Sequence, residues 1–523
     1  MNLLGFPLLS TLLWAPALGA LLLLLIPASR SAAQRWFALA ATGVAFVLAV
    51  AVAFVVMGAP PDPAGAAPLQ LVDRFAWLPS WGATYLIGVD GINLWLVLLT
   101  TFLAPFAVAA TWSRFTVQAR GMLALLLLAE TAFLGVFLAQ DMLLFYVFYE
   151  LALIPIVFLV GMWGGVGHSA AALKLFLFTF SGSVLMLVGI IGLYTLHRNA
   201  MAVLTPGYVG TFELAQITAD MRSGAFQLTP VAERLLFGAF FAAFAVKLAL
   251  WPLHTWVPDA YGAAPTPALI MLAGVMSKFG TYGLIRFNLS LFPQAAEWAA
   301  PAVGVLAVIG IIYAALVAYA QSDMQRVVAY SSVSHMNFIA LGIFALNPIG
   351  LNGALFQMVA HGLTTTFLLL LVAVLYERRE LRELGAFGGL WRVMPAYSGL
   401  ALLALLATAG LPGLISFIGE FTLMQGVFSS AVLGWPFAAG AAVGVILAAV
   451  YSLRWFRVGF MGEAAQSGEL PDLDRRERLL LGTLAAAVVL GGLFPNLLFS
   501  SINSGVERLI ANTAPLLARI AGL

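Results

Sequence analysis

The stretch Phe244-Ala-Val-Lys247-Leu-Ala-Leu-Trp-Pro252-Leu-His-Thr-Trp-Val-Pro-Asp259 decides the fold, because it places a lysine and two prolines inside an apolar run. That run extends from Val231 to Ala264, and one continuous helix of this length would measure about 50 Å, well beyond a hydrocarbon core of about 30 Å. A second overlong run, Ser398 to Val432, is interrupted at Gly410-Leu-Pro-Gly413. Two interrupted helices in corresponding places are typical of transporters built from inverted repeats. We therefore expect two broken helices, each beside a polar cavity at mid-membrane depth.

The composition indicates a membrane protein with many spans. Of 523 residues, 63% are hydrophobic and only 9% are charged, a balance that polar surface could not cover in a soluble protein of this size. The absence of cysteine excludes disulfides, iron–sulfur clusters and thiolate metal sites within the chain. The net charge of +2 does not indicate nucleic-acid binding. Phosphate-binding glycine loops, nucleophile elbows and metal-binding histidine spacings are absent from the sequence.

Apolar windows of about twenty residues predict an all-α polytopic fold with about 14 transmembrane helices. The expected spans are residues 4–26, 36–57, 92–111, 121–139, 142–163, 171–196, 231–251, 266–287, 301–320, 327–346, 351–375, 398–425, 433–456 and 479–499.

We expect a single membrane domain, residues 1–523, that contains two inverted five-helix repeats. The first repeat is spans 4–8, residues 121–287, and the second is spans 9–13, residues 301–456. Helices 7 and 12 are the broken ones, at equivalent positions of the two repeats. Residues 457–523 hold the last span and a C-terminal tail, helical from Val506 onward, and alternation over Trp81 to Val89 predicts a short hairpin in a long connection.

The arginines indicate the orientation of the chain in the membrane. Fourteen of them lie in the connections that follow odd-numbered spans, against about seven on the opposite side. Cytoplasmic connections carry the positive excess, so both termini are expected on the outer side.

Several ionisable residues lie inside the expected spans, where an isolated charge costs several kcal/mol. All three lysines of the chain are among them, and lysine changes its proton affinity far more readily than arginine. A Glu–Lys pair that can close and open is therefore a switch of proton affinity. Moving one proton across about 180 mV requires roughly 4 kcal/mol, which is within the range of such a switch. The main candidates are Glu150, Lys247, Lys278, His361 and Glu420, with His335 nearer to a span end.

Other polar residues leave alternatives open. Lys174 either extends to the interface or has a functional role, His254 either relays protons or caps backbone groups, and Glu130 requires a partner that the sequence does not reveal. Three aspartates are expected to cap helices or set loop geometry, and two histidines are expected to be solvated: Asp141, Asp259 and Asp323, then His168 and His197.

Several long motifs resemble one family. They are Gly88-Val-Asp-Gly-Ile92, Asp141-Met-Leu-Leu-Phe-Tyr-Val-Phe-Tyr-Glu150, Lys247-Leu-Ala-Leu-Trp-Pro-Leu-His-Thr-Trp-Val-Pro-Asp259, Ser277-Lys-Phe-Gly-Thr-Tyr-Gly-Leu-Ile-Arg286, Gln321-Ser-Asp-Met-Gln-Arg326, Met358-Val-Ala-His-Gly362 and Leu411-Pro-Gly413 through Glu420. They occur in order from about residue 85 to 425, and they resemble the antiporter-like membrane subunits of respiratory complex I, which are similar to subunits of Mrp-type cation/proton antiporters. Glu420 stands where the M-type branch of the family carries glutamate and the other branches carry lysine.

The resemblance implies roles for individual residues. Glu150 and Lys247 match the ion pair of the family, Lys278 its central lysine, and Glu420 its exit-side carboxylate. His335 and His361 match polar relay positions, and Glu130 matches an intramembrane glutamate of the M-type chain. One departure is Gln325, where the family often has lysine.

The resemblance also implies a proton-translocating subunit of NADH:quinone oxidoreductase in a bacterial inner membrane, with L-type and N-type antiporter-like chains as partners. It implies no cofactor in this chain; FMN, iron–sulfur clusters and quinone are expected in partner subunits. Three alternatives remain: an Mrp-type Na⁺ or K⁺/proton antiporter subunit, a membrane subunit of a related hydrogenase complex, and a scaffold whose charges only hold helices together.

Overall fold

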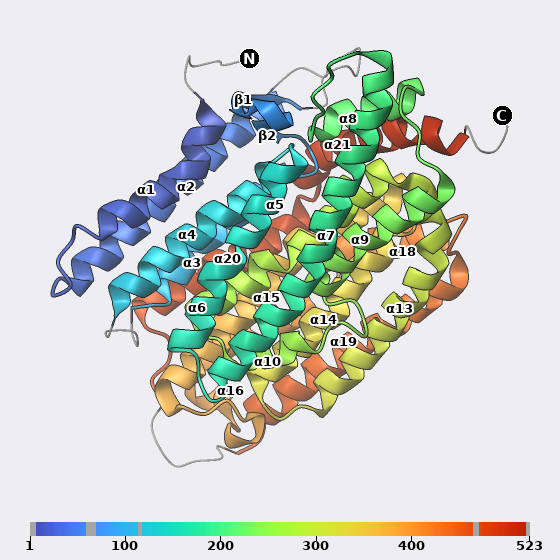
Figure 1. Ribbon diagram of the computed structural model, residues 1–523. Coiled ribbons are helices and arrows are strands. Elements are labelled where there is room, and N and C mark those ends of the chain that lie inside the picture. Colours follow the sequence, from blue (N-terminus) through green and yellow to red (C-terminus); the bar gives the residue numbers. More distant parts are fainter. Residues whose placement is uncertain (1–6, 59–68, 113–117, 464–469, 519–523) are drawn as a thin grey trace.

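The computed structural model describes residues 7–58, 69–112, 118–463 and 470–518, and these form an elongated bundle of helices (Figure 1). The first half contains α1 (Leu8–Leu23), α2 (Ser31–Gly58), β1 (Leu71–Leu78), η1 (Pro79–Trp81), β2 (Ala83–Val89), α3 (Leu94–Ala109), α4 (Ala119–Leu138), α5 (Met142–Leu151), α6 (Leu153–Trp163), α7 (His168–Leu204), α8 (Leu214–Ser223), α9 (Pro230–Leu248) and α10 (Trp256–Ala263). The second half contains α11 (Thr266–Met271), η2 (Leu272–Met276), α12 (Lys278–Gly283), η3 (Leu284–Leu289), α13 (Pro293–Ala320), α14 (Met324–Ile343), α15 (Pro348–Arg379), η4 (Leu384–Ala386), α16 (Leu390–Val393), α17 (Pro395–Thr408), α18 (Ile415–Phe428), α19 (Trp435–Phe460), α20 (Arg475–Leu493) and α21 (Asn496–Ala518).

The expected all-α membrane fold is confirmed. In the described ranges eight helices are long and apolar enough to cross a membrane, and four shorter apolar helices, α1, α3, α17 and α18, accompany them. Each of the fourteen expected ranges coincides with a helix or a broken helix. The apolar stretches of the span from α11 to η3 and of helix α15 are wholly buried, so they form the centre of the bundle. By contrast, large apolar side chains of α2 and α7 are exposed, as expected of surfaces that face lipid.

Both predicted breaks are present. Helix α9 ends at Leu248 and α10 begins at Trp256, and α17 ends at Thr408 six residues before Leu414, the residue ahead of α18. Pro258 does not interrupt the chain a second time, because it lies in the first turn of α10, where its missing N–H is not needed. The span from α11 to η3 also departs from regular geometry, through two π-helical turns, η2 and η3.

One end of the bundle, named here the hairpin end, carries strands β1 and β2, helix α8 and helix α21 (Figure 1). The two strands pair antiparallel, with Leu71 opposite Val89, so the predicted hairpin is confirmed and is longer than Trp81 to Val89. Asp90, directly after β2, receives two hydrogen bonds of 2.7 and 2.8 Å from Arg286 of η3, which fastens the hairpin to the central span. The opposite end, named here the arginine end, holds α10 and α16, together with Arg378 in the last turn of α15, Arg382 in the connection after it, and Arg454 of α19.

The last span is shorter than predicted. We expected residues 479–499, but α20 ends at Leu493, and α21 starts at Asn496 and is bent from it by 65°. Pro495 explains the difference, because the residue before a proline is disfavoured in helical geometry, and Phe494 has φ −123° and ψ 55°. The helical tail is confirmed as far as Ala518; residues 519–523 lie outside the described part, as do residues 59–68 of the long connection before the hairpin.

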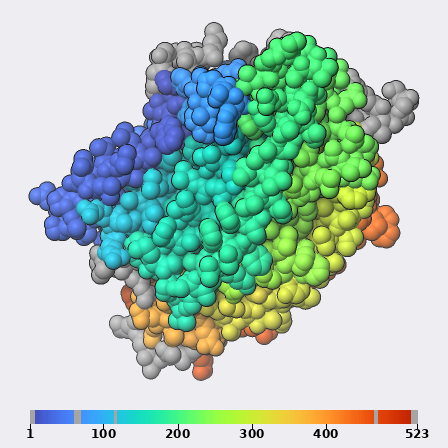
Figure 2. Space-filling model, viewed as in Figure 1, coloured from blue at the N-terminus to red at the C-terminus, as the bar shows by residue number. Residues whose placement is uncertain are grey.

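The first two helices form a flank of the molecule. Figure 2 shows α1 and α2 projecting beside the main body, while α7 runs along the face toward the viewer. Helix α4 lies between this flank and the centre, since α1, α3 and α5 all pack against it. The centre of the bundle, which carries Lys278 and His361, is therefore enclosed on several sides by apolar helices.

Candidate functional site: a buried polar line

Lys247 lies in the last turn of α9, at the first break. Beyond it Ala249 has a positive φ of 63°, which ends the helix and frees backbone groups. Asn337 of α14 bonds two of them: its amide nitrogen donates to the Ala249 carbonyl at 3.2 Å, and the Trp251 N–H donates to its amide oxygen at 3.3 Å. The Lys247 ammonium thus lies at the negative end of a helix dipole, at a break that another helix holds in place.

The expected Glu150–Lys247 pair is open in this structure. No ion pair joins them in the described chain, and Nζ of Lys247 has no hydrogen-bond partner among the described residues. It lies 4.8 Å from the centre of the Tyr149 ring, which offers a cation–π contact in place of a carboxylate. Glu150, at the end of α5, is partly exposed. The two side chains are near enough to interact electrostatically but are separated.

A narrow pocket beside Lys247 reaches Ser277, the residue before Lys278. Lys247 lines it, together with the hydroxyl-bearing residues Tyr261, Ser277 and Ser332. Tyr261 interacts with both serines, and the Ser277 hydroxyl lies 3.2 Å from the ammonium of Lys278. Hydroxyl groups both donate and accept hydrogen bonds, so these three residues place polar groups between the two lysines, although none of the described residues hydrogen-bonds to Nζ of Lys247.

Lys278 is fully buried at the start of α12, directly after the π-helical turn η2. Its Nζ donates to the Ala273 carbonyl at 2.8 Å and lies 2.8 Å from Nδ1 of His361 on α15. Because an ammonium only donates, Nδ1 of His361 accepts when Lys278 is charged, and Nε2–H then points to the Thr365 hydroxyl at 3.2 Å. A π-helical turn beside a buried lysine is a frequent feature of functional sites.

The line continues to the second break. The His361 ring lies 5.9 Å from that of His335 on α14, measured between ring centres. Nδ1 of His335 lies at an ion-pair distance of 3.2 Å from Oε1 of Glu420, without hydrogen-bond geometry, and that oxygen accepts a 3.1 Å hydrogen bond from the Gln357 amide. The hydroxyl of Tyr451 lies 3.3 Å from Nε2 of His335. Lys278, His361, His335 and Glu420 are thus brought together from four helices, although 142 positions separate the first from the last in the sequence.

The second break positions Glu420. Gly410 has a positive φ of 74°, and a Cβ atom built there would lie 2.6 Å from Oε2 of the glutamate. Gly413, in the same break, has a φ of 94° and open space around it. Both positions favour glycine for conformational reasons, but only Gly410 leaves room for the carboxylate.

Replacing Gly410 by alanine is expected to impair proton transfer through Glu420. The new methyl group would push the carboxylate away from His335, in addition to a strain of about 1–2 kcal/mol from the left-handed backbone. Gly413→Ala is the matched control, because it brings the same strain without the contact. Proton translocation measured in vesicles should fall several-fold further in Gly410→Ala than in Gly413→Ala, at comparable thermal stability. Equal losses in both variants would contradict the assigned role of Gly410.

Glu130 is not joined to this line. It is fully buried in α4, and both of its carboxylate oxygens lack a hydrogen-bond partner among the described residues. It shares a helix face with Phe133 and Phe137, whose rings pack on Phe279, the neighbour of Lys278. Glu130 therefore lies on the side of α4 that faces the central span.

The secondary candidates Lys174, His254 and Asp259 form a separate group at the arginine end. Lys174 of α7 pairs with Asp259 at 2.7 Å, and both side chains are more than a third exposed, so the pair contributes little stability. Asp259 was expected to cap a helix or set loop geometry; it lies in the first turn of α10, pairs with Lys174 and lies 3.7 Å from Arg326. His254 is buried against the Tyr313 ring, within electrostatic reach of Lys174.

Two further aspartates and one glutamine tie helix ends together. Asp141 caps α5 and Asp323 caps α14, as expected. Burial raises the pKa of Asp141 to about 6, although three backbone N–H groups oppose the shift. Gln325 is buried in the first turn of α14, where its amide donates to the Tyr261 carbonyl at 2.6 Å and fastens the end of α10.

The prediction that His197 is solvated is wrong. Its side chain is fully buried, with Nε2 2.8 Å from Oδ2 of Asp220 and the ring packed against Phe226 and Tyr208. Asp220 belongs to α8, which folds back over the end of α7 and excludes water from the histidine. A helix within the long connection after α7 was not foreseen from the sequence.

Sequence reasoning also missed four polar side chains of the line: Asn337, Gln357, Tyr261 and Tyr451. The first two offered a signal, since each is an amide within an apolar helix. A buried amide requires hydrogen-bond partners, and these lie on other helices, where the sequence does not reveal them.

The fold and the line define a class: multi-pass membrane proteins in which two broken helices lie along a buried row of lysine, histidine and glutamate side chains. Residues 139–447 match the family described as NADH:quinone oxidoreductase/Mrp antiporter, TM. The chain belongs to this family.

Individual proteins and solved structures are similar to nearly the whole of this chain. NADH-quinone oxidoreductase subunit M of Rhodobacter capsulatus is 41% identical over 512 residues, 97% of this chain and 96% of that protein. A chain in the structure of respiratory complex I from Thermus thermophilus with bound NADH has a TM-score of 0.83 at 29% identity, covering 97% of this chain and 99% of that one. A chain of the Mrp complex from Dietzia sp. DQ12-45-1b has a TM-score of 0.80 at 22% identity and covers 96% of this chain and 52% of that one, which shows the shared fold.

Proposed function

We propose that this chain is a proton-translocating membrane subunit of NADH:quinone oxidoreductase. The observation that carries the proposal is the contact series from Lys278 through His361 and His335 to Glu420, with Lys247 reached through a hydroxyl-lined pocket. Glu420, a carboxylate at the position where the resemblance distinguishes the M-type branch, supports this function over that of an Mrp-type antiporter subunit.

In the proposed mechanism, Glu150 and Lys247 receive the signal from the redox reaction. An ionised Glu150 close to Lys247 stabilises the charged lysine, and separation removes that stabilisation. With the pair open, as in this structure, the proton of Lys247 moves through the pocket at Tyr261, Ser277 and Ser332 to Lys278. His361 and His335 then pass it to Glu420, from which it leaves the membrane.

We also propose an orientation of the chain in the membrane, its internal repeats and its partners. The arginine end faces the cytoplasm of a bacterial inner membrane and the hairpin end faces outward, in accord with the positive excess in the connections. Residues 121–287 and 301–456 form two inverted repeats, each containing one broken helix. The chain binds no redox cofactor; FMN, iron–sulfur clusters and quinone belong to partner subunits. L-type and N-type antiporter-like chains are its neighbours in the membrane.

The test is purification of a tagged chain from native membranes in mild detergent, followed by mass spectrometry and reconstitution into proteoliposomes. We expect a flavin and iron–sulfur NADH arm, two sister antiporter-like chains, and proton uptake driven by NADH and quinone. Recovery with small membrane subunits alone and sodium-dependent proton exchange would instead identify a cation/proton antiporter. A nickel–iron arm would identify a hydrogenase complex.

A further inference from the structure

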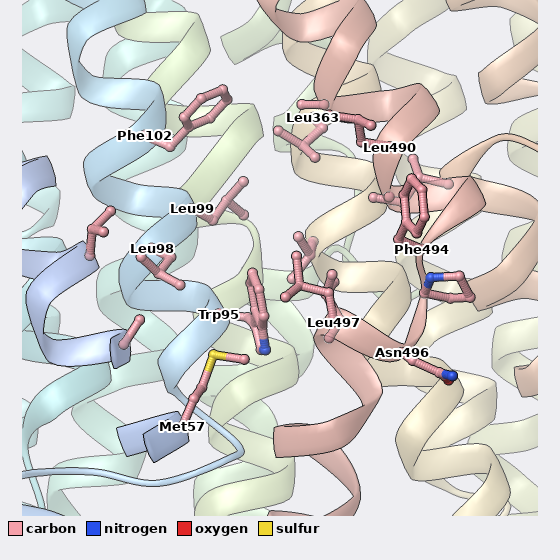
Figure 3. Close-up of a pocket in the computed structure, with 18 of the residues that line it drawn as sticks. Met57, Trp95, Leu98, Leu99, Phe102, Leu363, Leu490, Phe494, Asn496 and Leu497 are labelled. Atoms are coloured by element: carbon pink, nitrogen blue, oxygen red, sulfur yellow. The ribbon is translucent and has the colours of Figure 1, made fainter. Parts of the chain in front are cut away.

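A large apolar groove opens at the side of the bundle, away from the polar line. Its volume is about 1180 Å³, larger than the roughly 300–1000 Å³ of sites for drug-sized ligands. Figure 3 shows Trp95, Leu98 and Phe102 of α3 on one wall, facing Leu363, Leu490 and Phe494 on the other. We call it the α2/α20 groove; it is lined by residues within 46–58, 95–102 and 487–498, together with Val359, Leu363 and Ile415.

The groove is open to the bilayer and is lined by apolar groups. Phe54, Phe494 and Leu497 at its rim are 75%, 62% and 55% exposed, so it opens laterally rather than into the protein. The indole N–H of Trp95 is directed to the Ser501 hydroxyl at 2.7 Å. Water is disfavoured against such walls, and an empty space of this size would forfeit the dispersion contacts of its lining. Within a membrane the groove therefore has to be filled by apolar chains.

The dimensions of the groove match one leaflet. On α2 it extends from Phe46 to Gly58, twelve steps of 1.5 Å or about 18 Å, against about 15 Å for half of the hydrocarbon core. It ends at the helix bend, where α21 turns by 65° and Asn496 lies at the rim. A membrane-spanning helix of a partner would need a groove through both leaflets. A quinone ring would need polar groups directed into the groove, and the lining directs none there apart from the amide of Asn496.

We propose that the α2/α20 groove binds the acyl chains of a phospholipid from the leaflet at the hairpin end, with the headgroup beside Asn496. The lipid packs against Val359 and Leu363, which flank His361 on α15, and against Ile415, which begins α18 five residues before Glu420. The lipid thus packs against the two helices, α15 and α18, that carry His361 and Glu420.

The test uses phospholipids with a photoreactive diazirine near the end of one acyl chain, with the intact complex in nanodiscs. After illumination, mass spectrometry locates the labelled peptides. We expect labelling concentrated on peptides from 46–58, 95–102 and 487–498. Labelling spread evenly over the lipid-facing helices, absence of label from the groove, or preferential labelling by a photoreactive quinone analogue would each overturn the proposal.

Two alanines of α20 give a matched pair of variants. Ala487 lines the groove, whereas its neighbour Ala486 is exposed and does not. Ala487→Trp projects an indole ring into the groove and narrows it, which should lower groove labelling about tenfold, a loss of about 1.4 kcal/mol in binding free energy. Ala486→Trp should leave labelling unchanged. If Ala487→Trp does not assemble, Leu98→Trp on the opposite wall supplies the same test. Unchanged labelling of the groove in whichever of these two variants assembles would overturn the proposal.

Discussion

Replacing Lys278 by methionine is expected to abolish proton translocation by the assembled complex. Methionine keeps the length and apolar body of the side chain and removes the group that exchanges a proton. The ammonium of Lys278 lies 3.2 Å from the Ser277 hydroxyl and 2.8 Å from Nδ1 of His361, and so joins the two residues. Its loss interrupts the line near its middle. Loss of a positioned proton donor typically lowers a rate by 10² to 10⁴, and we expect a decrease of about 100-fold or more.

The measurement is the initial rate of acidification in proteoliposomes at equal amounts of assembled complex, checked on native gels. Removing the ammonium leaves Nδ1 of His361 without its partner, which costs about 1–3 kcal/mol, so somewhat lower thermal stability is also expected. Lys174→Met is the matched control, because it makes the same substitution at a half-exposed ion pair outside the line. It should change the rate less than about fivefold, in keeping with a surface pair worth at most about 1 kcal/mol. Undiminished translocation in Lys278→Met would contradict the proposed path.

Much of the fold could be predicted from local sequence signals. The breaks in spans 7 and 12 follow from proline and glycine in apolar runs that are too long for one membrane crossing, and the structure has both. Features that depend on tertiary packing were harder to predict from the sequence. Burial of His197 requires α8 to fold back over α7, and the end of the last span depends on a bend at Pro495 that hydropathy does not register.

The candidate site shows the same division. The residue types were recognisable from the sequence, because lysine and glutamate in apolar spans are energetically costly and usually have a function. Their order in space was not, because His335, His361 and Glu420 lie on three different helices and meet only after packing. Asn337, which holds the first break, appears from the sequence as one more polar residue in a helix; its role follows from the backbone groups that Ala249 and Trp251 leave free.

Lys247→Met is the second decisive substitution, and it is expected to stop translocation without weakening the complex. Lys247 forms no hydrogen bond with any described residue, so its removal leaves no buried group newly unsatisfied. Only its cation–π contact with Tyr149 is lost, so thermal stability and assembly should stay close to those of the native complex, in contrast to Lys278→Met. The vesicle assay should again show a loss of about 100-fold or more. Coupled turnover at the native rate in this variant would contradict the proposed mechanism.

Combining this substitution with Glu150→Gln separates a switch from a static ion pair. In the open arrangement seen here Glu150 forms no hydrogen bond with Lys247, so Glu150→Gln alone should preserve stability. It should nevertheless slow translocation if the pair closes in each cycle, because the charged lysine then loses its carboxylate. The double variant should be no slower than Lys247→Met, since Glu150 acts through that lysine. Additive losses of rate in the double variant would mean that Glu150 serves another part of the complex. A Glu150→Gln variant with the native rate but lower stability would mean that the charge of Glu150 only holds helices together.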